Sequence, residues 1–328
     1  MLLKTLSFIS LLFFFSIIYL LTIYPTEVLL YFWNFFIPIV PLIIFISVGT
    51  WRNICPLAFL YQLPQLFGFS LNLYYPDSFR KWSFYVATIV LFVLIISRKF
   101  LLNSDATVLF YLFSLLILTV VFLGMLFSGK SGWCTSICPI YPIERLYGQK
   151  PLMELKNCFI KSNNVCENCT TRCFDKVKTN SYLFDVQSKK SNERIERDRK
   201  IFAGSFAGFV YGFFAVDSQP INTIVEIYFY ILLYSFVSYI LFYILTKIFS
   251  KFMEDSIISL FSIIAFNIYY IYTIPRSLNM LLPNFNYTFY LHIVFQIVIF
   301  FFSYLWIKKL CIVNFSILKD NFILKSKK

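Results

Sequence analysis

The stretch that decides the fold reads GKSGWCTSICPIYPIERLYGQKP at residues 129–151 and, after a short polar link, NCFIKSNNVCENCTTRC at 157–173. It holds six of the eight cysteines of the chain: Cys134, Cys138, Cys158, Cys166, Cys169 and Cys173. Long apolar segments lie on both sides of it. A polar, cysteine-rich stretch between such segments is typical of a loop in a membrane protein, because only helices and closed barrels cross a bilayer.

Composition supports a polytopic, all-α integral membrane protein. The chain is 59% hydrophobic, whereas soluble domains contain about 45–50% apolar residues. The pattern predicts about eight transmembrane helices, since a helix needs roughly 20 apolar residues to cross the bilayer. We expect them at residues 6–23, 28–48, 82–97, 106–128, 201–216, 221–249, 257–274 and 287–307. Residues 57–82 are also apolar but are interrupted by Pro64, Gly68 and Pro76, so we expect this segment to be interfacial or re-entrant.

These segments divide the chain into three parts. Residues 1–128 form a four-span membrane region with a Cys-Pro motif, 129–200 a loop, and 201–328 a second four-span region with a basic tail. With eight spans both termini lie on one side, together with most of the Lys and Arg residues that account for the net charge of +13. The positive-inside rule then predicts a multi-pass protein of the cell inner membrane, with both termini and the cysteine loop in the cytoplasm. The chain has no basic, aromatic-rich soluble domain, so we expect no nucleic-acid partner.

The cysteine spacing indicates thiolate ligands. A cytoplasmic site is reducing, so a disulfide framework is not expected; structural thiols, zinc and iron–sulfur are the alternatives. Cys166-x2-Cys169-x3-Cys173 matches part of the bacterial ferredoxin spacing C-x2-C-x2-C-x3-C. The leading cysteine is displaced, because Asn163 stands at its position and Cys158 is the nearest upstream candidate.

A second unit ends in proline. Cys134-x3-Cys138 is followed by Pro139, and Cys55-Pro56 repeats this ending after the second predicted span. Trp51 occupies the position four residues before Cys55. Four thiolates also suit zinc, but C-x2-C-x3-C beside C-x3-C-P favours iron–sulfur. The eighth cysteine, Cys311, ends the last span on the same side. We interpret it as structural, and it is also the only candidate for an eighth ligand if two clusters are bound.

Trp51–Pro56 (WRNICP) and Gly129–Pro139 (GKSGWCTSICP) resemble the polytopic 4Fe–4S-binding membrane proteins with C-x3-C-P motifs. That group includes the quinol-dehydrogenase membrane subunit of periplasmic nitrate reduction and the maturation proteins of nitrous oxide reductase and of haem–copper oxidases. Gly129–Pro151 is similar to an uncharacterised 4Fe–4S-binding branch. The similarity covers residues 49–56 and 129–176, and the flanking spans match only in kind.

The resemblance implies a cytoplasmic ferredoxin-type module that binds a 4Fe–4S cluster, one or two per chain, and carries out electron transport. It implies iron ligation by Cys134, Cys138, Cys166, Cys169 and Cys173, with Cys158 and Cys55 as further candidates. Expected partners are membrane lipid, a redox protein as donor or acceptor, and quinol. Two alternatives are a maturation or regulatory factor that uses its cluster, and a membrane scaffold with a structural zinc module. As an electron-transfer component the chain need not be an enzyme on its own.

Four other sequence patterns give weaker indications of function. The single histidine, His292, excludes bis-histidine haem ligation within the chain. Glu226 and His292 lie near span ends, where ionisable residues are candidates for quinol or proton handling. Residues 124–131 match the phosphate-loop pattern G-x4-G-K-S, but that loop needs a preceding strand, and a predicted span stands there. Glycines at 204, 208 and 212 form a small-xxx-small pattern that predicts close helix packing.

Overall fold

The computed structural model describes residues 2–73, 75–127, 132–148, 152–153, 189–216, 224–249, 254–282 and 288–325. Within these residues the chain is helical apart from short connections. The sole β-type pairing in this described part is an isolated bridge between Leu73 and Phe127. The all-helical fold class is therefore confirmed.

The helices follow one another with short turns in the N-terminal region: α1 (Leu2–Ile23), α2 (Pro25–Tyr31), the π-helical η1 (Phe32–Phe36), α3 (Ile37–Ile46), α4 (Val48–Ile54), α5 (Pro56–Leu66), α6 (Asp77–Ser97), the π-helical η2 (Arg98–Leu102) and α7 (Ala106–Leu126). The remaining helices are α8 (Tyr141–Tyr147), α10 (Lys189–Ala215), α11 (Ile224–Ile248), α12 (Glu254–Leu281) and α13 (Thr288–Lys325). α13 continues beyond the predicted eighth span, so the basic tail is largely an extension of that helix.

Seven helical segments among the described residues are long and apolar enough to cross a membrane: Thr5–Ile23, Pro25–Ile46, Trp82–Leu102, Ala106–Leu126, Ile224–Ile248, Glu254–Leu281 and Phe289–Lys308. They coincide with seven of the predicted spans and confirm a multi-pass membrane protein. The other prediction, residues 201–216, falls on the C-terminal part of α10 and is not among the seven. The charged first half of α10 leaves its apolar part short.

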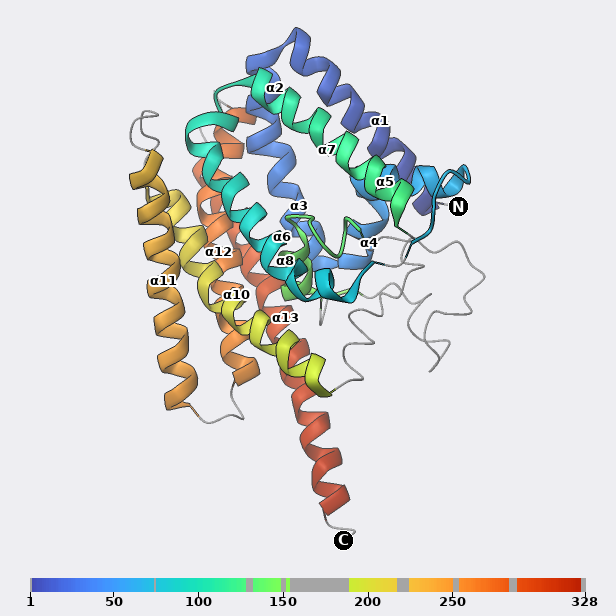
Figure 1. Ribbon diagram of the computed structural model, residues 1–328. Coiled ribbons are helices and arrows are strands. Elements are labelled where there is room, and N and C mark those ends of the chain that lie inside the picture. Colours follow the sequence, from blue (N-terminus) through green and yellow to red (C-terminus); the bar gives the residue numbers. More distant parts are fainter. Residues whose placement is uncertain are drawn as a thin grey trace.

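That apolar part of α10 lies inside the bundle. α10 packs against both α11 and α12, and its Phe202 and Phe209 are almost completely buried. Figure 1 shows α10, α11 and α12 side by side. Burial against two neighbouring helices explains how so short an apolar segment is accommodated.

The bundle has two distinct ends (Figure 1). One holds α4, α5 and α8, and we call it the cysteine end because Cys55, Cys134 and Cys138 lie there. The other holds the α1–α2 turn and the connection from η2 to α7, and we call it the distal end. α1 starts at the cysteine end, where the Ser7 hydroxyl donates a hydrogen bond to the Asn53 carbonyl. α13 runs from the distal end past the cysteine end.

Residues 57–82 do not span, as predicted. α5 has only 11 residues and ends at Leu66. The chain then turns through Gly68, whose φ of 78° lies in the left-handed region that suits glycine. The extended residues after it bond to the end of α7: the amide of Leu71 donates to the Met125 carbonyl at 2.7 Å. This segment therefore covers the cysteine end of α7.

Proline disturbs the second span, and α12 compensates. Pro38 has no N–H, so the Asn34 carbonyl four residues earlier loses its α-helical donor. The hydroxyl of Ser277 on α12 donates to this carbonyl, and that of Tyr270 donates to the Pro38 carbonyl at 2.7 Å. The backbone between α2 and α3 adopts the π-helical form η1 just before Pro38. Neighbouring polar groups thus satisfy the interrupted ladder, as membrane helices require.

Glycines on α10 allow it to approach α11 closely, which confirms the packing role predicted for them. A β-carbon on Gly208 would overlap the Tyr234 carbonyl oxygen and would lie 2.5 Å from the Ser238 β-carbon. The Ser238 hydroxyl donates to the Gly204 carbonyl at 2.6 Å. Small residues and interhelical hydrogen bonds together stabilise such contacts in lipid.

Two hydrophobic cores fill the bundle. One is built mainly from α3, α6, α8 and the C-terminal helices α10–α13; the other from α1, α2, α5, α7 and Trp133. Cys55 packs against the first, whereas Cys134 and Cys138 pack against the second. The cysteines therefore lie where the two cores adjoin at the cysteine end.

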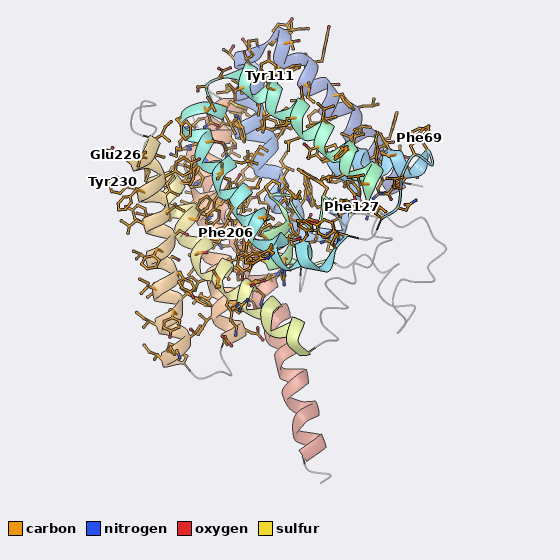
Figure 2. All side chains as sticks on the ribbon, viewed as in Figure 1. Phe69, Tyr111, Phe127, Phe206, Glu226 and Tyr230 are labelled. Atoms are coloured by element: carbon orange, nitrogen blue, oxygen red, sulfur yellow. The ribbon has the colours of Figure 1, made fainter. Side chains whose placement is uncertain are left out.

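The outer surface is apolar. On α7, Tyr111, Leu115, Leu118 and Phe122 recur at helical spacing and are each about 60–70% exposed. Figure 2 shows Tyr111 and Tyr230 extending outward from α7 and α11, whereas Phe206 points into the bundle. In water so large an apolar surface would promote aggregation, so this face is suited to lipid.

Candidate functional site

Cys55 lies between two short helices. α4 begins after Ser47, whose hydroxyl oxygen accepts from the Thr50 amide at 3.3 Å, and it ends at Cys55. Because the residue before a proline avoids the helical region, Cys55 is extended, with φ −61° and ψ 121°. Pro56 then starts α5, where a missing N–H does no harm. Cys55 is consequently the N-cap residue of α5.

Cys134 and Cys138 share one tight turn. The carbonyl of the buried Trp133 accepts three backbone amides, from Ser136, Ile137 and Cys138, each at 3.1 Å. The turn ends at Pro139, and α8 begins two residues later at Tyr141. This placement agrees with the predicted effect of the proline, although the turn is not a regular α-helical one.

Tyr61 anchors the approach to this turn. It is fully buried in α5; its hydroxyl donates to the Phe127 carbonyl at 3.2 Å and accepts from the Gly132 amide at 3.1 Å. Gln65, one turn later, donates to the same Phe127 carbonyl at 3.0 Å. Two side chains of α5 therefore hold the backbone on either side of residues 128–131, close to Cys134.

Cys134 and Cys55 lie near enough to Cys138 to act electrostatically on its thiol. Its surface is partly accessible, yet burial raises its pKa well above the usual value, and the negative charges of Cys134, Glu144 and Cys55 raise it further. Cys55, although it belongs to a distant motif, is therefore within electrostatic range of the C-x3-C-P turn. Thiolate at Cys138 requires compensating positive charge, which ligated iron would supply.

An ion pair joins the two motifs. Arg52 Nε lies 2.8 Å from Glu144 Oε2, and the two side chains are 19% and 6% exposed. The next residue, Arg145, is also buried and places its guanidinium 4.9 Å from the Phe84 ring centroid. Gly148 lets α8 approach α4, because a β-carbon there would come within 3.0 Å of Val48. WRNICP and IERLYG thus form one structural unit.

The remaining cysteines are not placed. Cys158, Cys166, Cys169 and Cys173 lie outside the described residues. Cys311 belongs to α13, of which only the backbone is described at that position. Among the described residues no group of three or more His, Cys, Asp or Glu side chains is arranged to hold a metal ion.

The residues present nevertheless match the chemistry of an iron–sulfur cluster. Thiolates are the ligands of [4Fe–4S] clusters, which take four of them. Cys55, Cys134 and Cys138 supply thiols from one neighbourhood, and a complete site needs at least one more from outside the described residues. The apolar packing around them is the environment that tunes a redox centre.

Two other predicted features have different surroundings. Glu226 is exposed on the outer side of α11 (Figure 2), whereas His292 on α13 has a buried Nε2 with no hydrogen-bond partner in the described part of the chain. At the phosphate-loop pattern, Gly124 belongs to a helix and not to a strand. A β-carbon there would overlap the Tyr61 carbonyl oxygen, so close packing of α7 on α5 accounts for this glycine.

Comparison with known proteins gave no match: no protein-family model, no curated protein and no solved structure is similar to this chain. The sequence reasoning missed the roles of Arg52, Glu144 and Tyr61. Arg52 lies in the WRNICP motif and Glu144 in the IERLYG segment, and these positions could have marked both residues as candidates. Tyr61 could not be singled out from the sequence, because aromatic residues make up 21% of the chain.

Proposed function

We propose that this chain is a membrane-bound iron–sulfur protein that relays electrons between a reduced carrier or quinol and a partner in the membrane. The observation that supports it most directly is that Cys55, Cys134 and Cys138 all lie at the cysteine end, packed against the two hydrophobic cores. These thiols come from two C-P motifs that are 79 residues apart at their closest. If each cysteine acted only as a small apolar side chain, there would be no reason for the three to lie at the same end of the bundle.

The proposal includes the topology. We propose that the apolar part of α10 crosses the membrane as an eighth span, which places both termini and the cysteine end in the cytoplasm. Figure 1 supports an even number of crossings, since α1 begins at the cysteine end and α13 runs from the distal end past the cysteine end. Cys158, Cys166, Cys169 and Cys173 then belong to the cytoplasmic module and are candidates for the remaining ligands.

The chain's own residues have defined tasks in this function. Cys55, Cys134 and Cys138 would hold the cluster, whose one-electron chemistry is its own. Arg52 and Glu144 fix α4 against α8 and so keep thiols from two motifs in register. Packing of the cysteines against the hydrophobic cores excludes water and thereby influences the reduction potential.

The test is metal analysis of the full chain purified without oxygen. We expect about four irons with matching labile sulfide for one cluster and about eight for two. Replacing Cys134 or Cys138 by alanine should remove about four irons per chain and the corresponding EPR signal after dithionite reduction. Zinc in place of iron and sulfide would overturn the proposal, and so would unchanged iron in both variants.

Cys311→Ser is the matched control, because Cys311 is interpreted as structural. It changes a thiol of α13 and should leave the iron content and the EPR signal as in the original protein. Oxidation of a reduced quinol or of reduced ferredoxin by the loaded protein then distinguishes the two classes of donor.

A further inference from the structure

A cavity opens at the distal end, away from the cysteines. It has a volume of about 340 Å³, within the range of small-molecule sites. α2, η1, α3, η2, α10 and α12 all contribute to its wall. Three cations line it, namely Arg98, Lys99 and Arg276, and no Asp or Glu is among the described lining residues.

Both π-helical segments of the described chain border this cavity. η1 contributes Trp33 and Asn34, and η2 contributes Arg98 and Lys99. Such segments are rare, occur mostly as single turns inside α-helices and are frequently found at functional sites. Pro38 accounts for the disturbance near η1, but η2 contains no proline. The backbone is therefore reshaped twice at the same place.

The Arg98 guanidinium is held in a fixed orientation. It lies 4.0 Å from the Trp33 ring centroid and 5.3 Å from that of Phe213. The indole is itself fixed, since Trp33 Nε1 donates to the Leu102 carbonyl at 2.8 Å. Arg98 Nε donates to Asn103 Oδ1 at 3.3 Å. The two terminal NH2 groups of Arg98 have no hydrogen-bond partner among the described residues, so both can donate to a ligand in the cavity.

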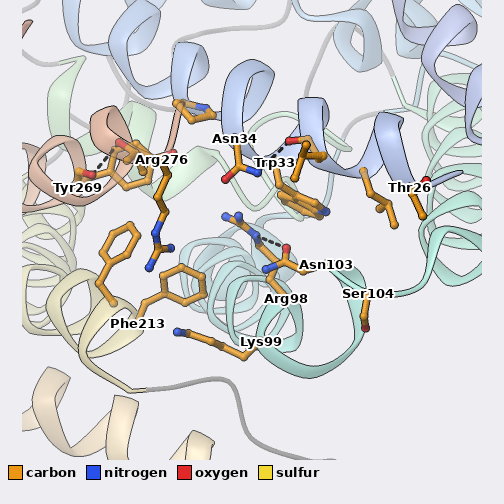
Figure 3. A pocket seen from close by; sticks show the side chains of 15 residues that line it. Thr26, Trp33, Asn34, Arg98, Lys99, Asn103, Ser104, Phe213, Tyr269 and Arg276 are labelled. Carbon is orange, nitrogen blue, oxygen red and sulfur yellow. Dashed lines mark hydrogen bonds between the residues drawn. The ribbon is translucent and has the colours of Figure 1, made fainter. Parts of the chain in front are cut away.

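Arg276 approaches from the opposite wall. Figure 3 shows its side chain extending from α12 toward the phenylalanines of α10, while Arg98 lies beneath Trp33. Its guanidinium is 5.3 Å from the Phe214 ring centroid, and it forms no ion pair within the described part of the chain. Lys99 adds a third charge beside them, with its Nζ 4.7 Å from the Phe213 ring centroid.

Neither structural packing nor topology explains this arrangement. Like charges gathered around one cavity repel each other, and two arginines without carboxylates destabilise a protein until an anion joins them. Planar guanidinium groups match the oxygens of a phosphate in a bidentate manner. Apolar lining residues such as Leu29, Leu30 and Pro38 complete the wall and suit the non-ionic remainder of an amphipathic ligand.

We infer that this cavity is a binding site for a phosphate group, with Arg98 and Arg276 as the recognition residues. A phospholipid headgroup and a soluble phosphate compound share this chemistry. The position at the end of a membrane-spanning bundle makes either source accessible. Phosphate binding at this site does not depend on the proposed iron–sulfur function, so the two proposals are tested separately.

The test uses the full chain purified in detergent and freed of lipid. In one arm, native mass spectrometry measures retention of phosphatidylglycerol against diacylglycerol with the same acyl chains, which lacks the phosphate. In the other arm, the thermal unfolding midpoint is measured with inorganic phosphate and with chloride at the same ionic strength. Selective retention of phosphatidylglycerol indicates a lipid source, and stabilisation by inorganic phosphate alone indicates a soluble one.

Arg276→Gln is the main variant, because its exposed side chain can be changed with little risk to folding. It should lower the affinity at least tenfold in whichever arm is positive, and Arg98→Gln should do the same. Arg276→Lys should lower it less, since charge is kept and the fork is lost. Lys247→Gln removes a cation that lies 5.5 Å from the Tyr243 ring centroid, outside this cavity, and should have no effect.

The inference is overturned if neither probe binds, or if Arg276→Gln and Lys247→Gln bind the probes equally well. Iron content provides the separation from the proposed function. It should be the same in Arg276→Gln as in the original protein, whereas the cysteine variants should lose iron and keep phosphate binding.

Discussion

Arg52 and Glu144, which are 92 residues apart, form a mostly buried ion pair with 2.8 Å between Arg52 Nε and Glu144 Oε2. It joins α4, which ends at Cys55, to α8, which follows Cys138. Buried ion pairs contribute little net stability compared with apolar replacements, but loss of one partner is strongly destabilising. Here the pair sets the position of one cysteine motif against the other.

Removing one partner should be more harmful than removing both. Arg52→Met leaves the Glu144 carboxylate buried without its cation and should lower the free energy of unfolding by about 3 kcal/mol. The double variant Arg52→Met/Glu144→Met should recover most of this loss. The measurement is unfolding in mixed detergents. A double variant that is less stable than either single one would contradict this account.

Tyr61→Phe tests the anchor of the Cys134 turn. It removes one hydroxyl and leaves two backbone groups, the Phe127 carbonyl and the Gly132 amide, without that partner. We expect a loss of about 1–3 kcal/mol in the free energy of unfolding. If the proposed function holds, iron should also dissociate faster from this variant. Tyr111→Phe on the lipid-facing surface is the control, and it should change neither quantity.

The sequence predicted the fold well where one-dimensional signals decide it. Apolar length located the seven spans, and interrupting prolines correctly marked residues 57–82 as non-spanning. The first half of α10 is charged, so its apolar part is too short to be counted with the seven spans. Burial between α11 and α12, and not length, accommodates this apolar part. Such burial depends on tertiary contacts that a window of sequence does not contain.

Sequence spacing supplies the ligand candidates of the site but not the residues that support them. Cysteine spacing singles out Cys55, Cys134 and Cys138, and the structure places all three at the cysteine end; their role as ligands stays a prediction. Tyr61 and the Arg52–Glu144 pair act across long sequence separations, and the residue types alone do not indicate their partners. The same applies to the distal cavity, because nothing in the sequence around Arg98 or Arg276 indicates that the two residues line one cavity.

Close packing of α10 on α11 makes Gly208 intolerant of a side chain. A β-carbon there would overlap the Tyr234 carbonyl oxygen, and backbone cannot move aside as a flexible side chain can. Gly208→Ala should separate the helices and lower the free energy of unfolding by about 1–3 kcal/mol. Gly212→Ala should be milder, because its β-carbon would meet the Tyr234 β-carbon at 3.0 Å. Equal losses in the two variants would argue against this contact.

A polar contact in the bundle interior joins α12 to α13. Asn267 Nδ2 donates to Ser303 Oγ at 3.0 Å, and both residues are buried. Interhelical hydrogen bonds in membranes have coupling energies of about 0.6 kcal/mol on average and rarely exceed about 1.7 kcal/mol. We therefore expect a double-mutant cycle of Asn267→Ala with Ser303→Ala to give a coupling in this range.

The matched cycle pairs Asn267→Ala with Ser259→Ala, whose hydroxyl donates to the Asp255 carbonyl within the same helix at 2.7 Å. Because these two residues share no hydrogen bond, their effects should add. Asn267 Oδ1 has no partner among the described residues, so Asn267→Leu should lose less stability than Asn267→Ala: it fills the space and removes an unsatisfied acceptor. Unfolding curves in which Asn267→Leu is the less stable variant would show that a bound water or another group satisfies that oxygen.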